Sequence, residues 1–219
     1  AVRVLEDAGF EVAVPDRWVC DGLTWHSTGQ LGTARRVLAR SLGAPELGGD
    51  EPVLVLEPSS ATMLRSDLPQ LLPDDARAKR LARRVVTLAE LLDRVEYVAP
   101  PAPSAVAPAI SQPHCHQQAV LGVDADRRVC ARNGVAISEE LTGCCGLAGN
   151  FGAEAGHEEV AQKVAELSLV PALDADVAAP VMADGFSCRT QIESLSGRRA
   201  RHLAEVLAER LPPEGDLAT

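Results

Sequence analysis

Residues 143–152 read Gly-Cys-Cys-Gly-Leu-Ala-Gly-Asn-Phe-Gly, and this stretch decides how the rest of the chain is interpreted. Adjacent cysteines cannot easily form a disulfide with each other. The glycines around them let the backbone fold tightly around a large ligand. Working outward, a third cysteine lies between two histidines and a fourth follows an apolar run near residue 180. The pattern predicts a soft-metal site with four ligands: Cys115, Cys144, Cys145 and Cys188.

Short apolar runs alternate with helical patterns along the chain, which is typical of βαβ units on a mostly parallel sheet. The predicted strands are residues 10–14, 53–56, 109–112, 135–138 and 180–183. The predicted helices are residues 32–42, 75–95, 124–132, 154–169 and 198–211. Each candidate ligand then follows a strand, where the carboxyl ends of parallel strands open into a crevice. The predicted fold class is α/β.

The Pro/Ala-rich segment 99–108 separates two halves of the chain, and we expect it to be a linker between a lobe at 1–98 and a lobe at 109–219. The halves are related, because in each an apolar strand leads at similar spacing to a loop that begins with cysteine and ends two residues later with glycine. The aligned pairs are Cys20 with Cys144, Asp21 with Cys145, and Ser60 with Cys188. An internal duplication therefore predicts two similar lobes, each a small, mostly parallel sheet flanked by helices.

The second lobe keeps its cysteines and the first has lost most of them, so we expect one metal site rather than two. The counterpart of Cys115 would precede residue 1. Residues 1–9 look like the last turns of an amphipathic helix that stops at Gly9. We therefore expect the chain to be part of a longer polypeptide.

Three interpretations of the four cysteines remain open: an iron–sulfur cluster, a zinc site, or ordinary buried thiols. Four thiolates suit tetrahedral zinc and a [4Fe–4S] cluster equally well by ligand count. Zinc sites usually take their ligands from two short CxxC-type knuckles, whereas this set extends from residue 115 to residue 188 and contains an adjacent pair. The spacing favours the iron–sulfur cluster.

The composition limits the partners and the compartment. A net charge of −10 argues against nucleic acid as the main partner, since that binding needs a basic face. No apolar run approaches the roughly 20 residues that a bilayer span requires, and no secretory signal opens the sequence. Reduced cysteines then predict a cytoplasmic location, with peripheral contact at the inner face of the membrane as a variant.

Three segments, residues 113–117, 143–152 and 183–192, resemble the cysteine-rich CCG domain. That family includes the cysteine-rich polypeptide of heterodisulfide reductase, the iron–sulfur subunits of glycolate oxidase and anaerobic glycerol-3-phosphate dehydrogenase, and lactate-utilisation proteins. More narrowly, the segments resemble the C-terminal region of fused enzymes with an FAD-linked oxidase module, a ferredoxin-type module and two CCG lobes. The resemblance covers essentially the whole chain.

The resemblance implies the iron–sulfur electron-transfer region of an FAD-dependent 2-hydroxy acid dehydrogenase of the D-lactate, glycolate or 2-hydroxyglutarate class. FAD would sit in an upstream module, and electrons would pass through a [4Fe–4S] cluster to a quinone, a cytochrome or another protein. The region would belong to an oxidoreductase without being catalytic alone. The alternatives are a cluster-based thiol/disulfide reductase of the heterodisulfide reductase type and a zinc-binding or structural lobe.

Asp21 and Ser60 stand where relatives have cysteines, which argues against a second cluster. Gln191 stands where heterodisulfide reductase completes a CxxC, so an ordinary four-cysteine cluster is expected.

Three further residues are candidate cofactor contacts. His114 and His116 flank a ligand, and in an extended segment one of them would face the cluster, the alternative being hydrogen bonds within the loop. Arg189 follows a ligand and would offset cluster charge, the alternative being a structural salt bridge.

Overall fold

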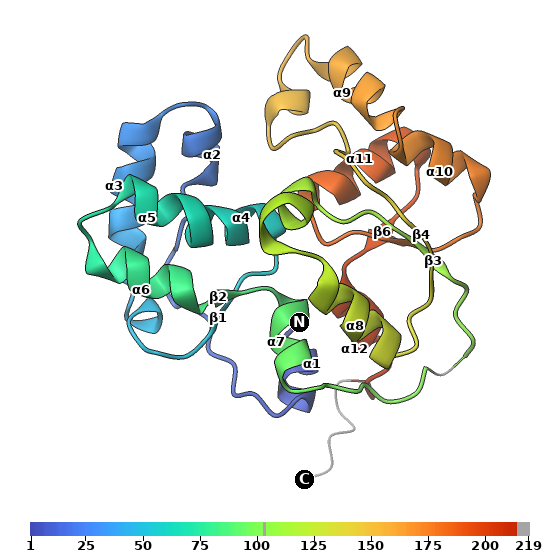
Figure 1. Cartoon of the computed structure of the whole chain (residues 1–219), viewed down its shortest axis with the longest axis horizontal. Helices are drawn as coiled ribbons and strands as arrows, with labels where there is room; N and C mark the ends of the chain where they lie inside the picture. Colours follow the sequence, from blue (N-terminus) through green and yellow to red (C-terminus); the bar gives the residue numbers. More distant parts are fainter. Residues whose placement is uncertain (103, 214–219) are drawn as a thin grey trace.

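A computed structural model describes residues 1–102 and 104–213 (Figure 1). Residue 103 of the predicted linker and residues 214–219 of the predicted second lobe lie outside the described residues. The helices are α1 Val2–Asp7, α2 Leu23–Ser27, α3 Leu31–Ser41, α4 Pro58–Thr62, α5 Leu68–Leu71, α6 Ala76–Arg84, α7 Leu88–Arg94, α8 Asp124–Arg132, α9 Glu158–Ala165, α10 Leu169–Ala175, α11 Phe186–Ser196 and α12 Leu203–Ala208. Short 3-10 or π-helical turns are η1 Pro45–Leu47, η2 Met63–Asp67, η3 Gln117–Leu121 and η4 Phe151–Ala153.

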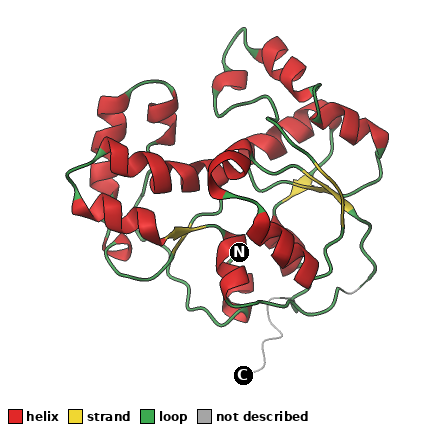
Figure 2. Cartoon of the chain, viewed as in Figure 1, coloured by secondary structure: helices red, strands yellow, loops and turns green. Residues whose placement is uncertain are grey.

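The strands form two small parallel sheets flanked by helices, which confirms the predicted fold class (Figure 2). They are β1 Val53–Leu54, β2 Val85–Val86, β3 Ala109–Ser111, β4 Ile137–Glu140, β5 Val181–Met182 and β6 Ala200–Arg201. The first sheet pairs β1 with β2, and the second has the order β4-β3-β5-β6 with every pair parallel. The apolar residues of β3 and β5 are buried, as expected for parallel strands covered on both faces.

The predicted helix 75–95 is wrong as a single element, because β2 interrupts it between α6 and α7. Val85 takes an extended conformation at the end of α6, and Thr87 then starts α7 with a capping box that it shares with Glu90. The cap satisfies backbone N–H groups at a new helix start and so favours a restart over continuation.

Two further predicted helices are not single elements in the structure. The predicted helix 198–211 contains β6, after which His202 caps α12. Within the predicted helix 154–169 only α9 lies as a complete helix, and α10 begins at the last predicted residue. By contrast, α8 has its predicted bounds and α3 lies one residue from them.

The predicted strand at residues 10–14 is also wrong, since within the described part of the chain these residues form a loop. An apolar cavity of about 790 Å³ is lined by this loop, by β1 and by Leu38 of α3. A strand is stabilised by hydrogen bonds to a neighbour, and no strand of the described residues pairs with residues 10–14.

One hydrophobic core joins the two halves of the chain. It packs α1 and α7 of the first half against α8 and α12 of the second (Figure 1). Its fully buried members include Val4, Leu88, Leu92, Val129 and Leu207. At its rim, Asp93 of α7 forms ion pairs with Arg128 and Arg132 of α8. The two sheets are therefore held together by shared packing.

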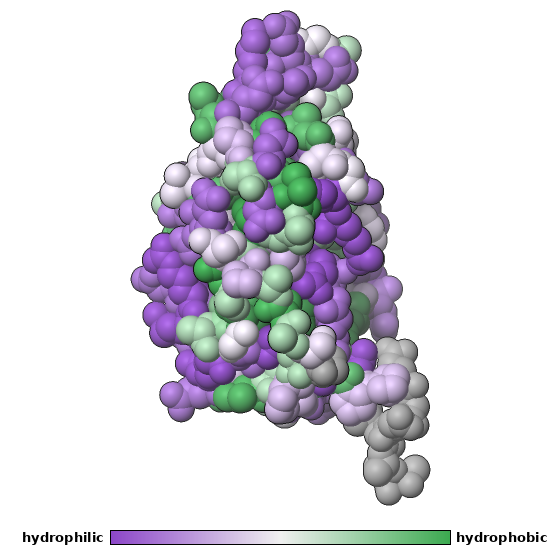
Figure 3. All heavy atoms as spheres, turned by 90° about the vertical axis from the view of Figure 1, so that its right-hand side faces the viewer, coloured by the Kyte–Doolittle hydropathy of each residue, from purple (hydrophilic) through white to green (hydrophobic). Residues whose placement is uncertain are grey.

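Across residues 1–102 and 104–213, the structure has no helix that is both long and apolar enough to cross a bilayer. On the face of the second half shown in Figure 3, hydrophobic patches are small and are interrupted by hydrophilic side chains. The hydrophilic side chains gather at the top of this view, over η4 and α9.

Candidate metal centre

The four candidate ligands follow the ends of three neighbouring strands, at one edge of the second sheet. Cys115 follows β3 and starts a helical turn, and the pair at 144–145 follows β4. Cys188 follows β5 and lies in the first turn of α11. Because β3 pairs directly with both β4 and β5, their carboxyl ends adjoin.

The structure places the four candidate cysteines as neighbours. The Cys144 thiol interacts with those of Cys115 and Cys145, which shifts its pKa. The pKa of Cys145 responds in turn to Cys144 and Cys188. Cys145 and Cys188 are only 3% and 1% exposed, whereas the other two thiols are half-buried. The site is therefore closed on the side of the core and accessible from the loops.

The neighbouring thiols shift one another's pKa in opposite directions. Interaction with Cys115 and Cys145 lowers the pKa of Cys144, helped by the backbone N–H groups of Gly146 and Ala148. The Gly146 nitrogen lies 3.3 Å from the Cys144 sulfur. Interaction with Cys144, together with burial, raises the pKa of Cys115 and of Cys145. A soft cation that displaced the thiol protons would find sulfur ligands already close together.

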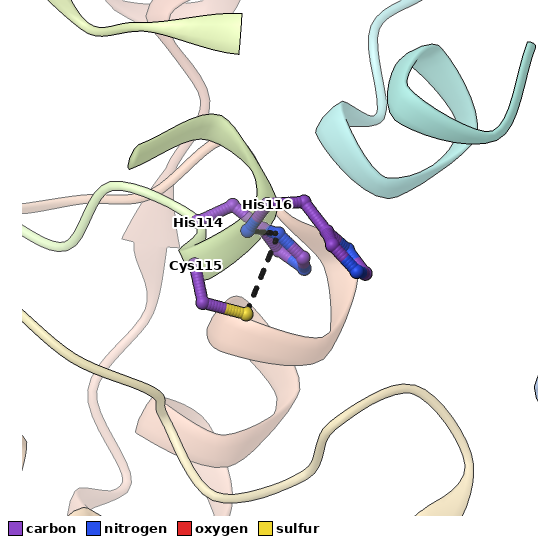
Figure 4. A group of neighbouring side chains, drawn as sticks. All are labelled: His114, Cys115 and His116. Carbon is purple, nitrogen blue, oxygen red and sulfur yellow. Dashed lines mark hydrogen bonds between the residues drawn. The ribbon is translucent and has the colours of Figure 1, made fainter. Parts of the chain in front are cut away.

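His114, Cys115 and His116 form a second grouping, in which the ligand atoms lie within 4.8 Å of one another (Figure 4). The two rings stack, with centroids 5.2 Å apart. The expectation that they alternate in direction assumed an extended segment, whereas residues 115 and 116 are helical. His114 is buried and His116 is exposed. Their contact with a cofactor stays a prediction.

The protonation of His114 follows from its neighbours. Its Nδ1 accepts the backbone N–H of His116 at 3.1 Å, so the neutral ring carries its proton on Nε2. Nε2 faces the Ser187 hydroxyl at 3.4 Å and the Glu57 carboxylate at 3.9 Å. Burial lowers the pKa of His114, and the Glu57 charge partly opposes this shift.

Arg189 donates to two backbone carbonyl oxygens, those of Ala183 and Asp184. Both belong to the loop between β5 and α11, so the guanidinium holds the loop from which Cys188 follows. This is neither of the two roles expected from the sequence, a salt bridge or a contact with the cofactor, and the cofactor contact stays a prediction.

The loop of the first half that aligns in sequence with the loop of the cysteine pair has related contacts, although Cys20 is its only cysteine. The Gly22 nitrogen lies 3.4 Å from the Cys20 sulfur, as Gly146 does from Cys144. The Ser60 hydroxyl donates to the Asp21 carboxylate. Those two residues align with Cys188 and Cys145, which also contact each other. In the first loop, the hydrogen bond between Ser60 and Asp21 thus occupies the position of the Cys188 and Cys145 thiols in the second loop.

Sequence reasoning missed three residues that position the loops. Gln112 donates to the Gly143 carbonyl at 3.3 Å, and Gln118 donates to the Leu141 carbonyl at 3.0 Å. Both amides tie the Cys115 segment to the loop of the cysteine pair. The third is Glu57, whose carboxylate accepts the Phe186 N–H at 2.6 Å. The sequence signal for Gln112 and Glu57 was a polar side chain at the end of a predicted strand, whereas Gln118 lies in the turn η3.

A small cavity of about 50 Å³ next to the site is lined by the half-buried carboxyl group of Asp126. Burial, reinforced by the charge of Asp184, raises the pKa of Asp126 to about 7. Gln117 donates to it and opposes the shift, while the Glu90 charge adds to it. The folded protein therefore holds a proton here that the unfolded chain releases near pH 4.

We expect the Asp126→Asn variant to be more stable than the parent protein at pH 8. Because folding raises the pKa of the Asp126 carboxyl, the parent protein loses stability as pH rises from about 4 to about 7. The amide of the variant cannot ionise, so the variant avoids this loss. The gain should be on the order of 2 kcal/mol at pH 8 and should vanish below pH 4. Urea unfolding at both pH values measures it. Asp124→Asn, an exposed position of the same helix, is the control, and an equal pH-dependent gain there would contradict the assignment.

Comparisons with known proteins relate the chain to two groups of oxidoreductase-associated proteins. No protein-family model matches it. It is 27% identical to lactate utilization protein A of Bacillus velezensis, over 95% of this chain and 91% of the relative. The same protein of Bacillus subtilis is 26% identical with the same coverage. D-2-hydroxyglutarate dehydrogenase of Pseudomonas putida is 38% identical over 37% of this chain, a segment that spans only 8% of the dehydrogenase. The chain is thus similar to lactate utilization protein A along nearly its whole length and to the dehydrogenases over part of it.

Proposed function

We propose that this chain is the iron–sulfur electron-transfer region of an FAD-dependent 2-hydroxy acid dehydrogenase. Cys115, Cys144, Cys145 and Cys188 would hold a [4Fe–4S] cluster. The observation that carries the proposal is that three adjoining strands end beside one another and bring four cysteine thiols close together. Such a donor set suits iron–sulfur ligation, and the bound cluster would supply one-electron chemistry.

The residues around the sulfurs support this use. The Gly146 and Ala148 N–H groups donate to the Cys144 sulfur, and backbone donors of this kind raise a cluster's reduction potential. The buried side of Cys145 and Cys188 keeps water from two ligands. The half-buried side of Cys115 and Cys144 would leave a short path for electrons from a flavin module or to an acceptor.

The names of the relatives point to the substrate class. Lactate utilization protein A and D-2-hydroxyglutarate dehydrogenase both refer to 2-hydroxy acids. We infer that FAD in an upstream module of the same polypeptide oxidises the substrate, and that a ferredoxin-like module precedes this region. A quinone, a cytochrome or another protein would accept the electrons.

The proposal includes an internal duplication, with lobes at 1–98 and 109–219. Two observations support it: the matching N–H contacts to Cys20 and Cys144, and the hydrogen-bonded pairs at equivalent positions of the two loops. In the first loop, Asp21 and Ser60 hydrogen-bond to each other where a cluster would need two ligands. One cluster per chain is therefore expected.

Anaerobic reconstitution with iron and sulfide, followed by reductive titration, tests the function. The reconstituted protein should be brown, should take up about one electron per chain and should then show an electron paramagnetic resonance signal. A protein that binds iron but takes up no electron would contradict the electron-transfer role. Stoichiometric zinc would favour a structural site that uses Cys115 and its two histidines.

A further inference from the structure

Helix α11 carries the candidate ligand Cys188 but starts without a cap from its own segment. Gly185 precedes the helix and has no side chain that could accept its first N–H groups. Cys188 is the third residue of the helix, within the turn that depends on such a cap. An uncapped first turn frays, and fraying here would move a ligand.

Glu57, from the other half of the chain, supplies the missing acceptor. Its Oε2 accepts the N–H of Phe186, the first residue of α11, at 2.6 Å. The negative charge also suits a helix N-terminus, where the peptide dipoles leave partial positive charge. The acceptor lies 129 residues away in sequence, so the contact exists only in the folded chain.

Glu57 is itself held in place. It caps α4, where its Oε1 accepts the Ser59 hydroxyl at 2.8 Å. The neighbouring carbonyl of Leu56 lies 3.1 Å from Nε2 of His202, at the start of α12. Residues 56 and 57 thus bind the second half at two points, and the carboxylate has little freedom to follow a moving helix.

The surroundings of Cys188 have little room for adjustment. A methyl group built on Gly185 would lie 2.4 Å from the His114 ring and 3.3 Å from the Cys188 sulfur. Glu57 Oε1 lies 3.9 Å from Nε2 of the same ring. A displacement of the helix start would therefore reach Cys188 and the residue next to Cys115 together.

We propose that Glu57 is a positioning residue that caps α11 across the two halves of the chain and so fixes Cys188 at the metal centre. The first half would then serve the site through this carboxylate, although its own cysteine set is lost. This role rests on the proposed function in that it treats Cys188 as a ligand. The cap itself exists in the metal-free protein and is testable there.

The test measures the alkylation rate of each cysteine in the metal-free, reduced protein, with iodoacetamide as the probe and mass spectrometry to locate the label. In Glu57→Ala we expect Cys188 to react about tenfold faster, which corresponds to the loss of a charged hydrogen bond. Glu57→Gln keeps an oxygen acceptor and should restore most of the protection. Cys130, buried in α8, is the internal reference and should be unchanged.

Asp75→Ala is the matched control variant, because Asp75 caps α6 in the same half of the chain through a 2.9 Å bond to the Arg77 N–H. It should leave Cys188 protected. An unchanged Cys188 rate in Glu57→Ala, or a parallel rise at Cys130, would overturn the positioning role. Failure to bind iron would overturn the proposed function instead, and it would leave the alkylation result standing.

Discussion

Replacing Cys145 with serine should abolish iron binding. Cys145 contacts both Cys144 and Cys188, so it connects the ligands that follow β4 to the ligand that follows β5. It is also almost fully buried, which leaves no room for an exogenous thiol to take its place. We expect the iron content after anaerobic reconstitution to fall from about four atoms per chain to less than about one.

Cys130→Ala is the control for this experiment. Cys130 is also buried, and burial raises the pKa of its thiol to about 12, as expected for a thiol that packs as a small hydrophobic side chain. The alanine variant should bind as much iron as the parent protein. Full iron content in Cys145→Ser, or a comparable loss in Cys130→Ala, would contradict the assigned ligand set.

Gly146→Ala should be the most destabilising single methyl addition in the loop of the cysteine pair. Gly146 has φ +101°, which an alanine adopts only with strain. The added carbon would also lie 2.0 Å from the backbone oxygen of Ala161 in α9, and a backbone atom cannot move aside as a side chain does. We expect a loss of at least about 3 kcal/mol in the free energy of unfolding, measured in urea.

Gly149→Ala provides the comparison, because Gly149 lies in the same loop with φ +73° but has open space around the added methyl group. Its cost should be about 1 kcal/mol, from the left-handed conformation alone. Equal losses in the two variants would show that the contact with Ala161 is not what fixes the loop. Retained iron binding in Gly146→Ala would show that the cysteines do not depend on its geometry.

Much of the second sheet could be predicted from the sequence. The predicted strands at residues 109–112 and 180–183 each contain a short apolar run, and they form β3 and β5 within about one residue of the predicted bounds. Parallel strands place their carboxyl ends at one edge, so the convergence of the cysteines followed from the strand pattern. The glycines beside the cysteine pair correctly indicated a tight loop.

The remaining features depend on tertiary contacts. β2 and β6 are two-residue strands that exist because a partner strand lies beside them. The capping box of Thr87 and Glu90 marks the restart of the helix but does not show that Val85 and Val86 pair with β1. Residues 10–14 show the converse, since an apolar run without a neighbouring strand stays a loop. Glu57 binds Phe186 across 129 residues. A Glu-Pro-Ser sequence indicates a helix start, but it cannot show which second helix the carboxylate caps.

Iron and acid-labile sulfide, measured per chain after anaerobic reconstitution, test the central claim most directly. The account predicts about four of each, in keeping with a single [4Fe–4S] cluster on four cysteines. About eight of each would mean that the first loop also binds a cluster, despite its Asp21–Ser60 hydrogen bond. A colourless protein with no iron, or one with stoichiometric zinc, would contradict the claim that the four sulfurs form an iron–sulfur site.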